Sequence, residues 1–241
     1  MKLIASDFDG TILIDEKIKT EDIKAIRDFQ DKGNLFGLVT GRTYHSLFVL
    51  IEGKIDPDFV IANNGSHIFV KNGKDMTEVL KYSLDQDKIR DVIDFYGGKY
   101  QTRIFTDKDR AVDKISDLIE GEEILSLAIY SDNMLENPFQ EDLSFHKSIG
   151  VTDVINSAVS KQTGVEFIKD FYRFGMEIIA IGDDFNDISF LEQTRLSFSL
   201  NYVKEREVLD AVNFTVEGIR ELIENIDEFQ KSLIRRGFPL N

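Results

Sequence analysis

Acidic side chains gather at one point of the chain, directly after an apolar run. The segment IAIGDDFNDI, residues 179–188, contains Asp183, Asp184, Asn186 and Asp187. Carboxylates this close oppose each other's ionisation unless a cation or a solvated turn relieves the repulsion. An isolated cluster of this kind would favour an exposed turn, and the D-x-[DN]-x-[DN]-G spacing of a calcium loop fails from either Asp183 or Asp184. Other parts of the sequence must therefore decide between a solvated turn and a metal site.

Two more polar clusters follow short apolar runs. DFDGT occupies residues 7–11 after the run at 3–5, and TGR occupies residues 40–42 after the run at 35–39. Ligands of open α/β sheets bind beyond the carboxyl ends of the strands. Each cluster alone is a weak signal, because it also fits a turn, a loop before a helix or a solvated bend. Three clusters at three strand ends, however, predict one shared site.

Strand-like apolar runs alternate with helical patterns in the first and last parts of the chain. The expected strands cover residues 3–5, 35–39, 59–62, 178–181, 196–198 and 214–216. The expected helices begin near residue 21, cover residues 44–51, run from Val165 to an end at Gly175, and occupy residues 219–233. This alternation predicts an α/β fold with a doubly wound parallel sheet that helices cover on both faces.

The middle of the chain has a looser pattern. Between residues 73 and 155, turn signals such as Asn72-Gly73 separate few strongly apolar runs. We interpret this stretch as an inserted α+β unit of roughly 80 residues, which is large enough to bury a small core of its own. The expected domains are a core formed by residues 1–72 and 156–241 and an inserted domain formed by residues 73–155.

Composition and charge narrow the classes of function. The net charge of −15 argues against a nucleic-acid or anionic-membrane surface, because both partners would be repelled. No apolar stretch approaches the ~20 residues of a membrane helix, and the start MKLIASDFDG becomes acidic too early for a secretory signal. The absence of cysteine fits a reducing compartment. We therefore expect a cytoplasmic protein that acts on a small molecule, and the sequence does not indicate an oligomeric state.

The ordered set of short motifs resembles one family. DFDGTIL, TGR, the lone Lys161 in SKQTG, and GDDFNDI occur in the order found in the haloacid dehalogenase-like phosphatases, and the match is closest to the Cof-like or sugar-phosphatase-like branch. The resemblance implies a Rossmann-like core. About thirty residues separate Asp9 from Thr40, which is too few for a domain, whereas Arg42 and Lys161 lie far apart. An insertion at this second place implies the α+β cap of the second type.

The resemblance also implies a reaction at the first strand end. Asp7 would be the nucleophile that forms an aspartyl-phosphate, and Asp9 would be the acid–base residue that protonates the leaving oxygen and then activates water. Asp7, Asp183 and the main-chain carbonyl of Asp9 would bind Mg²⁺, a hard cation that prefers oxygen ligands. Asp184 is expected to be solvated or to lie behind the metal ligands. Asp187 would orient metal-bound water or a lysine.

Five residues are expected to bind the phosphate or the rest of the substrate. They are Thr40, Gly41, Arg42, Lys161 and Asn186. Thr40 offers a hydroxyl and Gly41 an N–H group at the start of a helix, where anions are favoured. Ser160 is expected to cap the following helix, which would place Lys161 in its first turn, and Arg42 could instead pair with an acid.

Several other polar residues have two interpretations. Asn63-Asn64-Gly65 follows an expected strand and is either a plain turn or a segment near the cleft. The histidines at positions 45, 67 and 146 have no metal-ligand spacing and are expected to be structural or exposed. In the inserted unit, charged residues either contact a second anionic group of the substrate or are merely solvated; these are Arg103, Lys108 and Arg110.

These residues together predict a Mg²⁺-dependent phosphatase that hydrolyses small phosphate monoesters, such as sugar phosphates or related phosphorylated metabolites. The alternative is a non-catalytic, metal-dependent module on the same fold that binds sugar phosphates or regulates. The presence of Asp7, Asp9, Lys161 and Asp183 together favours the enzyme.

Overall fold

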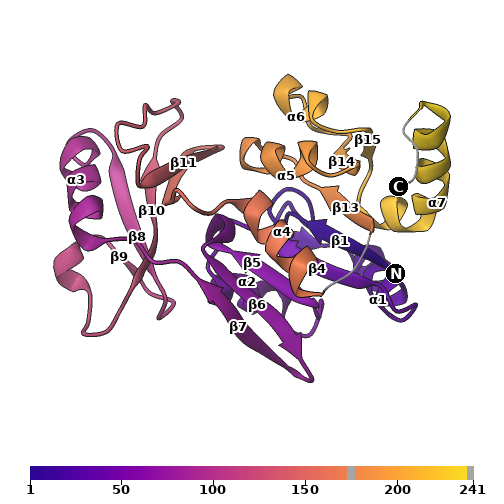
Figure 1. Ribbon diagram of the computed structural model, residues 1–241, viewed down its shortest axis with the longest axis horizontal. Helices are drawn as coiled ribbons and strands as arrows, with labels where there is room; N and C mark the ends of the chain where they lie inside the picture. Colours follow the sequence, from indigo (N-terminus) through magenta and orange to yellow (C-terminus); the bar gives the residue numbers. More distant parts are fainter. Residues whose placement is uncertain (173–176, 238–241) are drawn as a thin grey trace.

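A large, mostly parallel sheet forms one part of the computed structural model, which describes residues 1–172 and 177–237 (Figure 1). Its strand order is β15-β14-β13-β1-β4-β5-β6-β7. The bounds are β15 (Phe214–Val216), β14 (Leu196–Leu200), β13 (Glu177–Ile181), β1 (Lys2–Ser6), β4 (Leu35–Val39), β5 (Phe59–Ala62), β6 (His67–Asn72) and β7 (Asp75–Lys81). From β15 to β5 all neighbours are parallel, whereas β6 and β7 are antiparallel additions at one edge.

Helices cover both faces of this sheet. Successive side chains of a strand point to opposite faces, and Leu3, Ile4 and Ala5 of β1 are all completely buried, so neither face of the central strand reaches water. The covering helices are α1 (Thr20–Gln30), α2 (Tyr44–Ile51), α4 (Lys161–Phe171), α5 (Ile188–Glu192), α6 (Arg206–Asp210) and α7 (Ile219–Arg235). The predicted α/β fold with a parallel, doubly wound sheet is therefore confirmed.

Short strands and 3₁₀ turns join the main helices and strands of the large-sheet part. The helix expected to end at Gly175 ends at Phe171, and Gly175 lies outside the described residues. The remaining short elements of the large-sheet part are β2 (Leu13–Ile14), β3 (Lys17–Ile18) and the 3₁₀ turns η1 (Asn63–Gly65) and η3 (Phe185–Asp187), whereas the turn η2 (Ile115–Asp117) lies in the second part of the molecule. No helix within the described ranges is long and apolar enough to cross a membrane.

A smaller antiparallel sheet forms the second part, which we call the cap (residues 83–157). Its strand order is β11-β12-β10-β8-β9, and α3 packs against it (Figure 1). The bounds are α3 (Gln86–Tyr96), β8 (Gln101–Thr106), β9 (Ala111–Val112), β10 (Ile124–Tyr130), β11 (Leu143–Ser148) and β12 (Val151–Asn156). The cap buries a core of its own, in which Ile89 and Val92 of α3 meet Leu127 of β10. This is the α+β insertion that the fold class predicted.

The hairpin β6–β7 lies across the domain boundary expected at residue 73. Along β7 the strand pairs with β6 of the large sheet, from Asn72 with Asp75 to His67 with Lys81. The Asn72-Gly73 turn signal marks the tight hairpin itself, with Gly73 at φ +66° where only glycine is comfortable. Residues 75–81 thus belong to the large sheet, while the division of the chain into two domains stays a prediction.

Candidate active site

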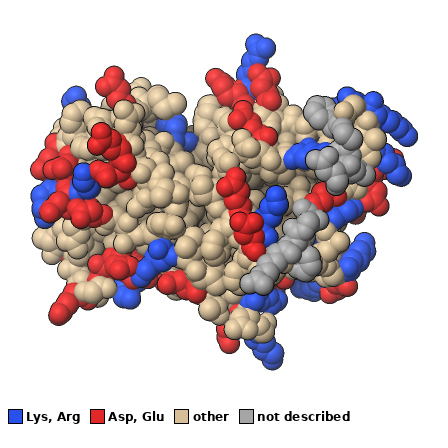
Figure 2. Space-filling view, in the orientation of Figure 1, with Lys and Arg blue, Asp and Glu red and all other residues tan. Residues whose placement is uncertain are grey.

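A cavity of about 770 Å³ lies between the large sheet and the cap. Asp7, Thr40 and Asp183, which follow β1, β4 and β13, all line it. The carboxyl ends of these parallel neighbours lie at one edge of the sheet, where ligands of such folds bind. Three motif segments that are distant in the sequence therefore meet at one cavity. Acidic side chains are also spread over the outer surface of both parts of the molecule (Figure 2).

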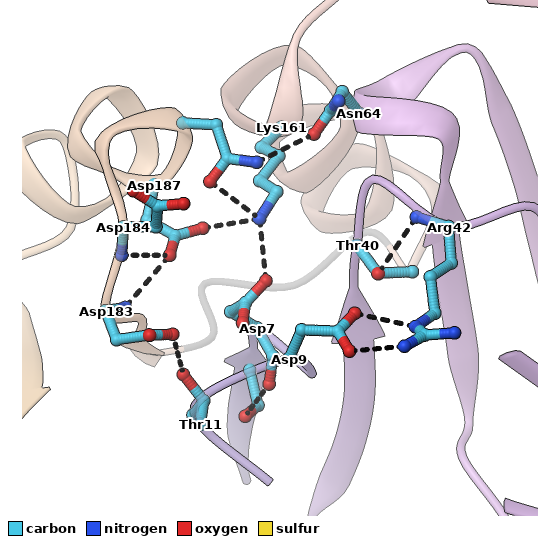
Figure 3. Close-up of polar contacts among 12 residues, drawn as sticks. Asp7, Asp9, Thr11, Thr40, Arg42, Asn64, Lys161, Asp183, Asp184 and Asp187 are labelled. Carbon is cyan, nitrogen blue, oxygen red and sulfur yellow. Dashed lines mark hydrogen bonds and ion pairs between the residues drawn. The ribbon is translucent and has the colours of Figure 1, made fainter. Parts of the chain in front are cut away.

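A buried lysine connects two of these segments. Lys161 is 1% exposed, and its Nζ lies 2.7 Å from Asp7 Oδ1 and 2.5 Å from Asp187 Oδ1 (Figure 3). Nζ also lies 3.3 Å from Asn186 Oδ1. Burial alone would lower the pKa of Lys161, but the charges of Asp187 and Asp7 outweigh it and raise the pKa. The lysine is therefore a fixed cation between two carboxylates.

The start of α4 fixes the position of this lysine. The Ser160 side chain accepts a hydrogen bond from the Thr163 N–H at 3.2 Å, and the Thr163 hydroxyl accepts one from the Ser160 N–H at 2.8 Å. This reciprocal capping box determines where the helix begins, as the sequence predicted for Ser160. Lys161 is consequently the first residue of the helix.

Asp187 holds the acidic loop together. Its Oδ2 accepts hydrogen bonds from the N–H groups of Asp183 at 2.9 Å and Asp184 at 3.1 Å, while Oδ1 contacts Lys161. A Cβ at residue 182 would lie 2.6 Å from the Asp187 carboxylate, so Gly182 is required for this close approach. Both oxygens of Asp187 are thus committed to protein partners, in keeping with a positioning role.

Asp183 is held by two hydroxyl groups. Thr11 donates to Oδ1 at 2.8 Å, and Tyr202 donates to Oδ2 at 2.7 Å. Burial, followed by the charge of Asp187, raises the pKa of Asp183 to about 6, against the lowering effect of the two hydroxyls. Gly10 has φ +82°, and a Cβ there would lie 2.1 Å from Asp183 Oδ2. The sequence motif therefore needs glycine at this position.

Three carboxylates are close enough to share one cation. Oxygen atoms of Asp7, Asp183 and Asp187 all lie within 4.8 Å of one another. Among the described residues, Asp7 Oδ2 has no hydrogen-bond partner although it is buried, and burial followed by the charge of Asp187 raises the pKa of Asp7 well above its usual value. A buried carboxylate oxygen without a partner is costly unless a cation compensates it. The cluster fits a metal ion held by hard oxygen ligands.

Asp9 lies outside this cluster and pairs with arginine. Its two carboxylate oxygens accept hydrogen bonds from Arg42 Nε at 2.7 Å and Nη2 at 2.6 Å (Figure 3). The fork geometry is the strong, bidentate form of this ion pair. The buried hydroxyl of Thr40 accepts the N–H of Arg42 at 3.1 Å. Arg42 thus takes the acid partner that the sequence allowed as its second interpretation, and both side chains line the cavity.

A model of the haloacid dehalogenase-like hydrolases matches residues 4–142 and 99–217, which include all four motif segments. The chain belongs to this family. Both the family resemblance and the class of enzyme, a hydrolase of this family, are thereby confirmed.

Named relatives of this hydrolase are phosphatases. The 5-amino-6-(5-phospho-D-ribitylamino)uracil phosphatase YcsE of Bacillus subtilis is 28% identical over 241 residues, covering 93% of this chain and 95% of the relative. A phosphoglycolate phosphatase of Sulfurisphaera tokodaii is 26% identical and covers 93% of each chain. A solved structure from Bacteroides thetaiotaomicron, a phosphatase of the haloalkanoate superfamily, has a TM-score of 0.81 at 22% identity over 95% of each chain. These likenesses extend over nearly the whole hydrolase, cap included.

An asparagine that sequence reasoning left open connects the hydrolase site to the cap. Asn64 Oδ1 accepts from Asn186 Nδ2 at 3.2 Å, and Asn64 Nδ2 donates to Asp153 in the cap at 2.8 Å. Asn64 has φ +52°, a left-handed conformation that asparagine tolerates better than most residues. The Asn63–Gly65 segment is therefore at the cleft and not a plain surface turn. The only signal in the sequence was the paired asparagines before glycine.

Asp184 also reaches the cap. Its Oδ2 accepts the N–H of Ile149 at 3.0 Å, and its Oδ1 accepts the N–H of Phe185 at 2.7 Å. Asp184 is thus bound to the cap hairpin, where the sequence suggested a solvated or supporting acid. Sequence reasoning missed Tyr202, which lies in a turn with no motif and donates to Asp183.

Other candidate residues do not reach the cavity. The histidines are absent from the carboxylate cluster found among the described residues. His45 is exposed, His67 pairs with Glu78, and burial lowers the pKa of His146 to about 4. The three cap cations considered for a second anion pair instead with neighbouring acids: Arg103 with Asp113, Lys108 with Asp107, and Arg110 with Glu122.

Proposed function

We propose that this hydrolase is a Mg²⁺-dependent phosphatase that cleaves small phosphate monoesters through an aspartyl-phosphate on Asp7. The observation that carries the proposal is the state of the Asp7 carboxylate. One oxygen is held by Lys161 at 2.7 Å, and the other is buried, with no partner in residues 1–172 and 177–237, at a cavity where the three motif segments meet. A fixed carboxylate of this kind can attack phosphorus in line with the leaving oxygen.

Asp7 and Asp183 are the side chains proposed to bind Mg²⁺, together with the main-chain carbonyl of Asp9. When bound, the ion neutralises phosphate charge that would otherwise repel an anionic nucleophile. Asp187 is proposed to act behind them, because Lys161 and two backbone N–H groups already occupy its oxygens. Its part is to keep the lysine and the acidic loop in place.

Phosphate oxygens are proposed to contact Thr40, Gly41, Asn186 and Lys161. Thr40, Gly41 and Asn186 line the cavity, and the hydroxyl, N–H and amide groups supply neutral donors. Lys161 supplies the fixed positive charge beside Asp7. Such preorganised donors stabilise the charge that spreads over the transferred phosphoryl group.

Asp9 is proposed to protonate the leaving oxygen and then to take a proton from water. In the structure its carboxylate is held by both arms of Arg42. We propose that Arg42 turns one N–H group toward the incoming phosphate, which frees one oxygen of Asp9 for proton transfer. Arg42 would thereby bind substrate and release the acid–base residue in the same movement.

The large sheet and the cap are proposed to have different parts in the phosphatase reaction. We propose that the large sheet carries the chemistry and that the cap, as an inserted domain, closes over it. The two relatives act, by their names, on a ribitylaminouracil phosphate and on phosphoglycolate. Both are small phosphate monoesters, and we propose the same general class of substrate here.

The test is release of inorganic phosphate from p-nitrophenyl phosphate and from a panel of phosphorylated metabolites, with Mg²⁺ and with a chelator. We expect turnover that needs Mg²⁺ and that disappears in Asp7→Asn. A matched control is Asp184→Asn, an acid of the same loop that binds the cap, which should keep most of the rate. A folded wild-type protein that binds Mg²⁺ but hydrolyses none of these esters would favour the non-catalytic binding module instead.

A further inference from the structure

The cap presents one face of its sheet to the cavity. Side chains alternate along β10, so that Leu127 and Ile129 are buried in the core of the cap, whereas Ala128 and Tyr130 line the cavity. Residues paired across antiparallel strands share a face, and Ala128 is paired with Asp153 of β12. The cavity wall therefore carries a carboxylate in the middle of the cap sheet.

Asp153 has one oxygen bound and one oxygen open. Asn64 donates to Oδ2 at 2.8 Å. In the part of the chain that the structure describes, Oδ1 receives no hydrogen bond and is not among the fully buried atoms. A carboxylate oxygen that faces a cavity without a protein donor is an acceptor for a donor of the ligand.

This acceptor lies beside the segment proposed to hold phosphate. A Cβ added at Gly41 would come within 3.2 Å of Asp153 Oδ2 and of Asn64 Nδ2. Asp153 therefore stands next to Thr40 and Gly41, where the first atoms of the group esterified to phosphate must pass. Burial raises the pKa of Asp153 to about 6, although the Asn64 hydrogen bond opposes the shift. At about pH 8 the carboxyl group is consequently ionised.

The cavity has little capacity for a second anion. Among its described lining residues the acids are Asp7, Asp9, Asp153, Asp183 and Asp184. Arg42 is the single cation of that lining, and it is already engaged by Asp9. A carboxylate or second phosphate on the substrate would face Asp153 without a cation to pair with, and such like-charge contacts are strongly unfavourable.

Arg103 is a cation on the same face of the cap sheet as Asp153. Arg103 of β8 is paired in register with Ala128, on the cavity side of the sheet. Its Nε lies 3.8 Å from Asp113 Oδ1, and Arg103 does not line the cavity as the structure describes it. If Arg103 turned inward, it would create an anion site beside Asp153. Such a site would favour substrates that carry a second anionic group, and a comparison of substrates with and without that group would detect it.

Apart from Ser148, the rest of the cap wall is largely apolar. Phe105, Tyr130, Ile149 and Val151 line it and suit the hydrocarbon or ring portion of a substrate. We propose that Asp153 is a specificity-determining residue that selects phosphate esters whose leaving group carries hydroxyl or ammonium donors, and that it rejects esters with a second anionic group. The inference rests on the proposed phosphatase function and names the substrate class: polyol or amino-polyol monophosphates rather than phosphorylated carboxylic acids.

A matched pair of substrates tests the proposal. Glycerol 3-phosphate and 3-phosphoglycerate have similar size and differ in a hydroxymethyl group against a carboxylate. With Mg²⁺ at about pH 8, we expect wild type to prefer glycerol 3-phosphate by at least about tenfold in kcat/KM. Asp153→Asn keeps the shape and an acceptor for Asn64 but removes the charge. It should lower that preference by at least about tenfold, chiefly through a smaller KM for the acid.

Two controls separate the possible failures. Turnover of p-nitrophenyl phosphate by wild type reports the proposed function alone, so its absence would refute the phosphatase and not Asp153 specifically. If this ester is cleaved but wild type prefers 3-phosphoglycerate, or if Asp153→Asn leaves the preference unchanged, the role of Asp153 is refuted. Arg103→Gln should not change the preference; a selective loss of 3-phosphoglycerate turnover in this variant would reveal an anion site and would also overturn the proposal.

Discussion

Asp7, which is buried, and Asp153, which is half-buried, are carboxylates at the same cavity, yet their surroundings differ. Within the part of the chain that the structure describes, each has one oxygen held by a protein group and the other without a protein donor. The partner of Asp7 is the cation Lys161, which also forms an ion pair with Asp187. The hydrogen-bond donor to Asp153 is the neutral side-chain amide of Asn64. We infer that aspartate serves two different purposes at this cavity, because the charge balance around the two side chains differs.

The two parts of the molecule that carry Asp7 and Asp153 differ in the same way. Around Asp7, the large-sheet side of the cavity is a dense network in which nearly every acid has a fixed partner, as expected where charge must be placed precisely for phosphoryl transfer. The cap side consists of an antiparallel sheet with small, apolar and aromatic side chains and one open carboxylate. We infer that the first side performs chemistry and that the second selects the substrate.

The largest expected effect belongs to the large-sheet side. Asp7→Asn removes the attacking charge and one carboxylate of the cluster, so kcat for any phosphate ester should fall by more than ~10⁴-fold. The fold should persist, because the ionised form of Asp7 is itself unfavourable where it is buried. Steady-state phosphate release and circular dichroism measure the two properties. Near-normal turnover by the folded variant would remove Asp7 from the chemistry.

Asp9→Asn should have a smaller effect that depends on the leaving group. The amide cannot donate the acid proton, so esters of poor leaving groups should slow by about 10²–10⁴-fold. Phosphorylation of the enzyme by p-nitrophenyl phosphate should suffer less, since nitrophenolate leaves without protonation. Single-turnover measurements on an alkyl and an aryl ester give this comparison. Equal losses for both esters would contradict the acid role of Asp9.

Substitutions of two neighbouring acids should distinguish a residue that binds Mg²⁺ from one that binds the cap. Asp183→Ala should weaken Mg²⁺ binding by more than ~10²-fold, because it removes a proposed direct ligand. Asp184→Ala should keep most of the affinity, since that side chain binds Ile149 of the cap. Thermal melting with and without Mg²⁺ detects the difference, because a ligand that binds only the native state raises its stability. Equal stabilisation of both variants would refute the assignment of Asp183.

The smallest effect concerns the stability contributed by the cap carboxylate. The folded-state pKa of Asp153, about 6, lies above its usual value of 3.8, so ionised Asp153 destabilises the fold above that pKa, and protonation removes the penalty as pH falls. Asp153→Asn should therefore be more stable than wild type at about pH 8, by about 1–3 kcal/mol, and the gain should shrink toward pH 4. Urea unfolding across this range measures it. A difference independent of pH would show that Asp153 is not held at raised pKa.

The large-sheet side was accessible from sequence because its chemistry lies in short contiguous segments. DFDGT and GDDFND keep glycines where a side chain would collide with Asp183 or Asp187, so motif and geometry are tied together. The Ser160 cap was equally local, since a capping box involves residues three apart. Parallel strands follow from alternation of buried runs and helices.

The cap side was less accessible for a physical reason. Asn64 and Asp153 are 89 positions apart, and their contact depends on how the two sheets meet. Tyr202 reaches Asp183 from a turn with no distinguishing composition. The Asn72-Gly73 signal predicts a turn, which the structure contains, but the boundary expected at residue 73 falls inside a hairpin, because a hairpin and a linker have the same local signal. The local signal does not show that β6 joins the large sheet through β5 and carries β7 with it.

The most direct test of the account is to trap the intermediate. In Asp9→Asn, p-nitrophenyl phosphate should still phosphorylate the enzyme, whereas hydrolysis of the acyl phosphate should slow for want of the base. Rapid acid quenching with Mg²⁺ present, followed by peptide mass spectrometry, should find one phosphoryl group on the peptide that contains Asp7 and none in Asp7→Asn. A phosphoryl group on another residue, or an Asp9→Asn enzyme that turns over the ester without ever carrying phosphate on Asp7, would contradict the proposed mechanism.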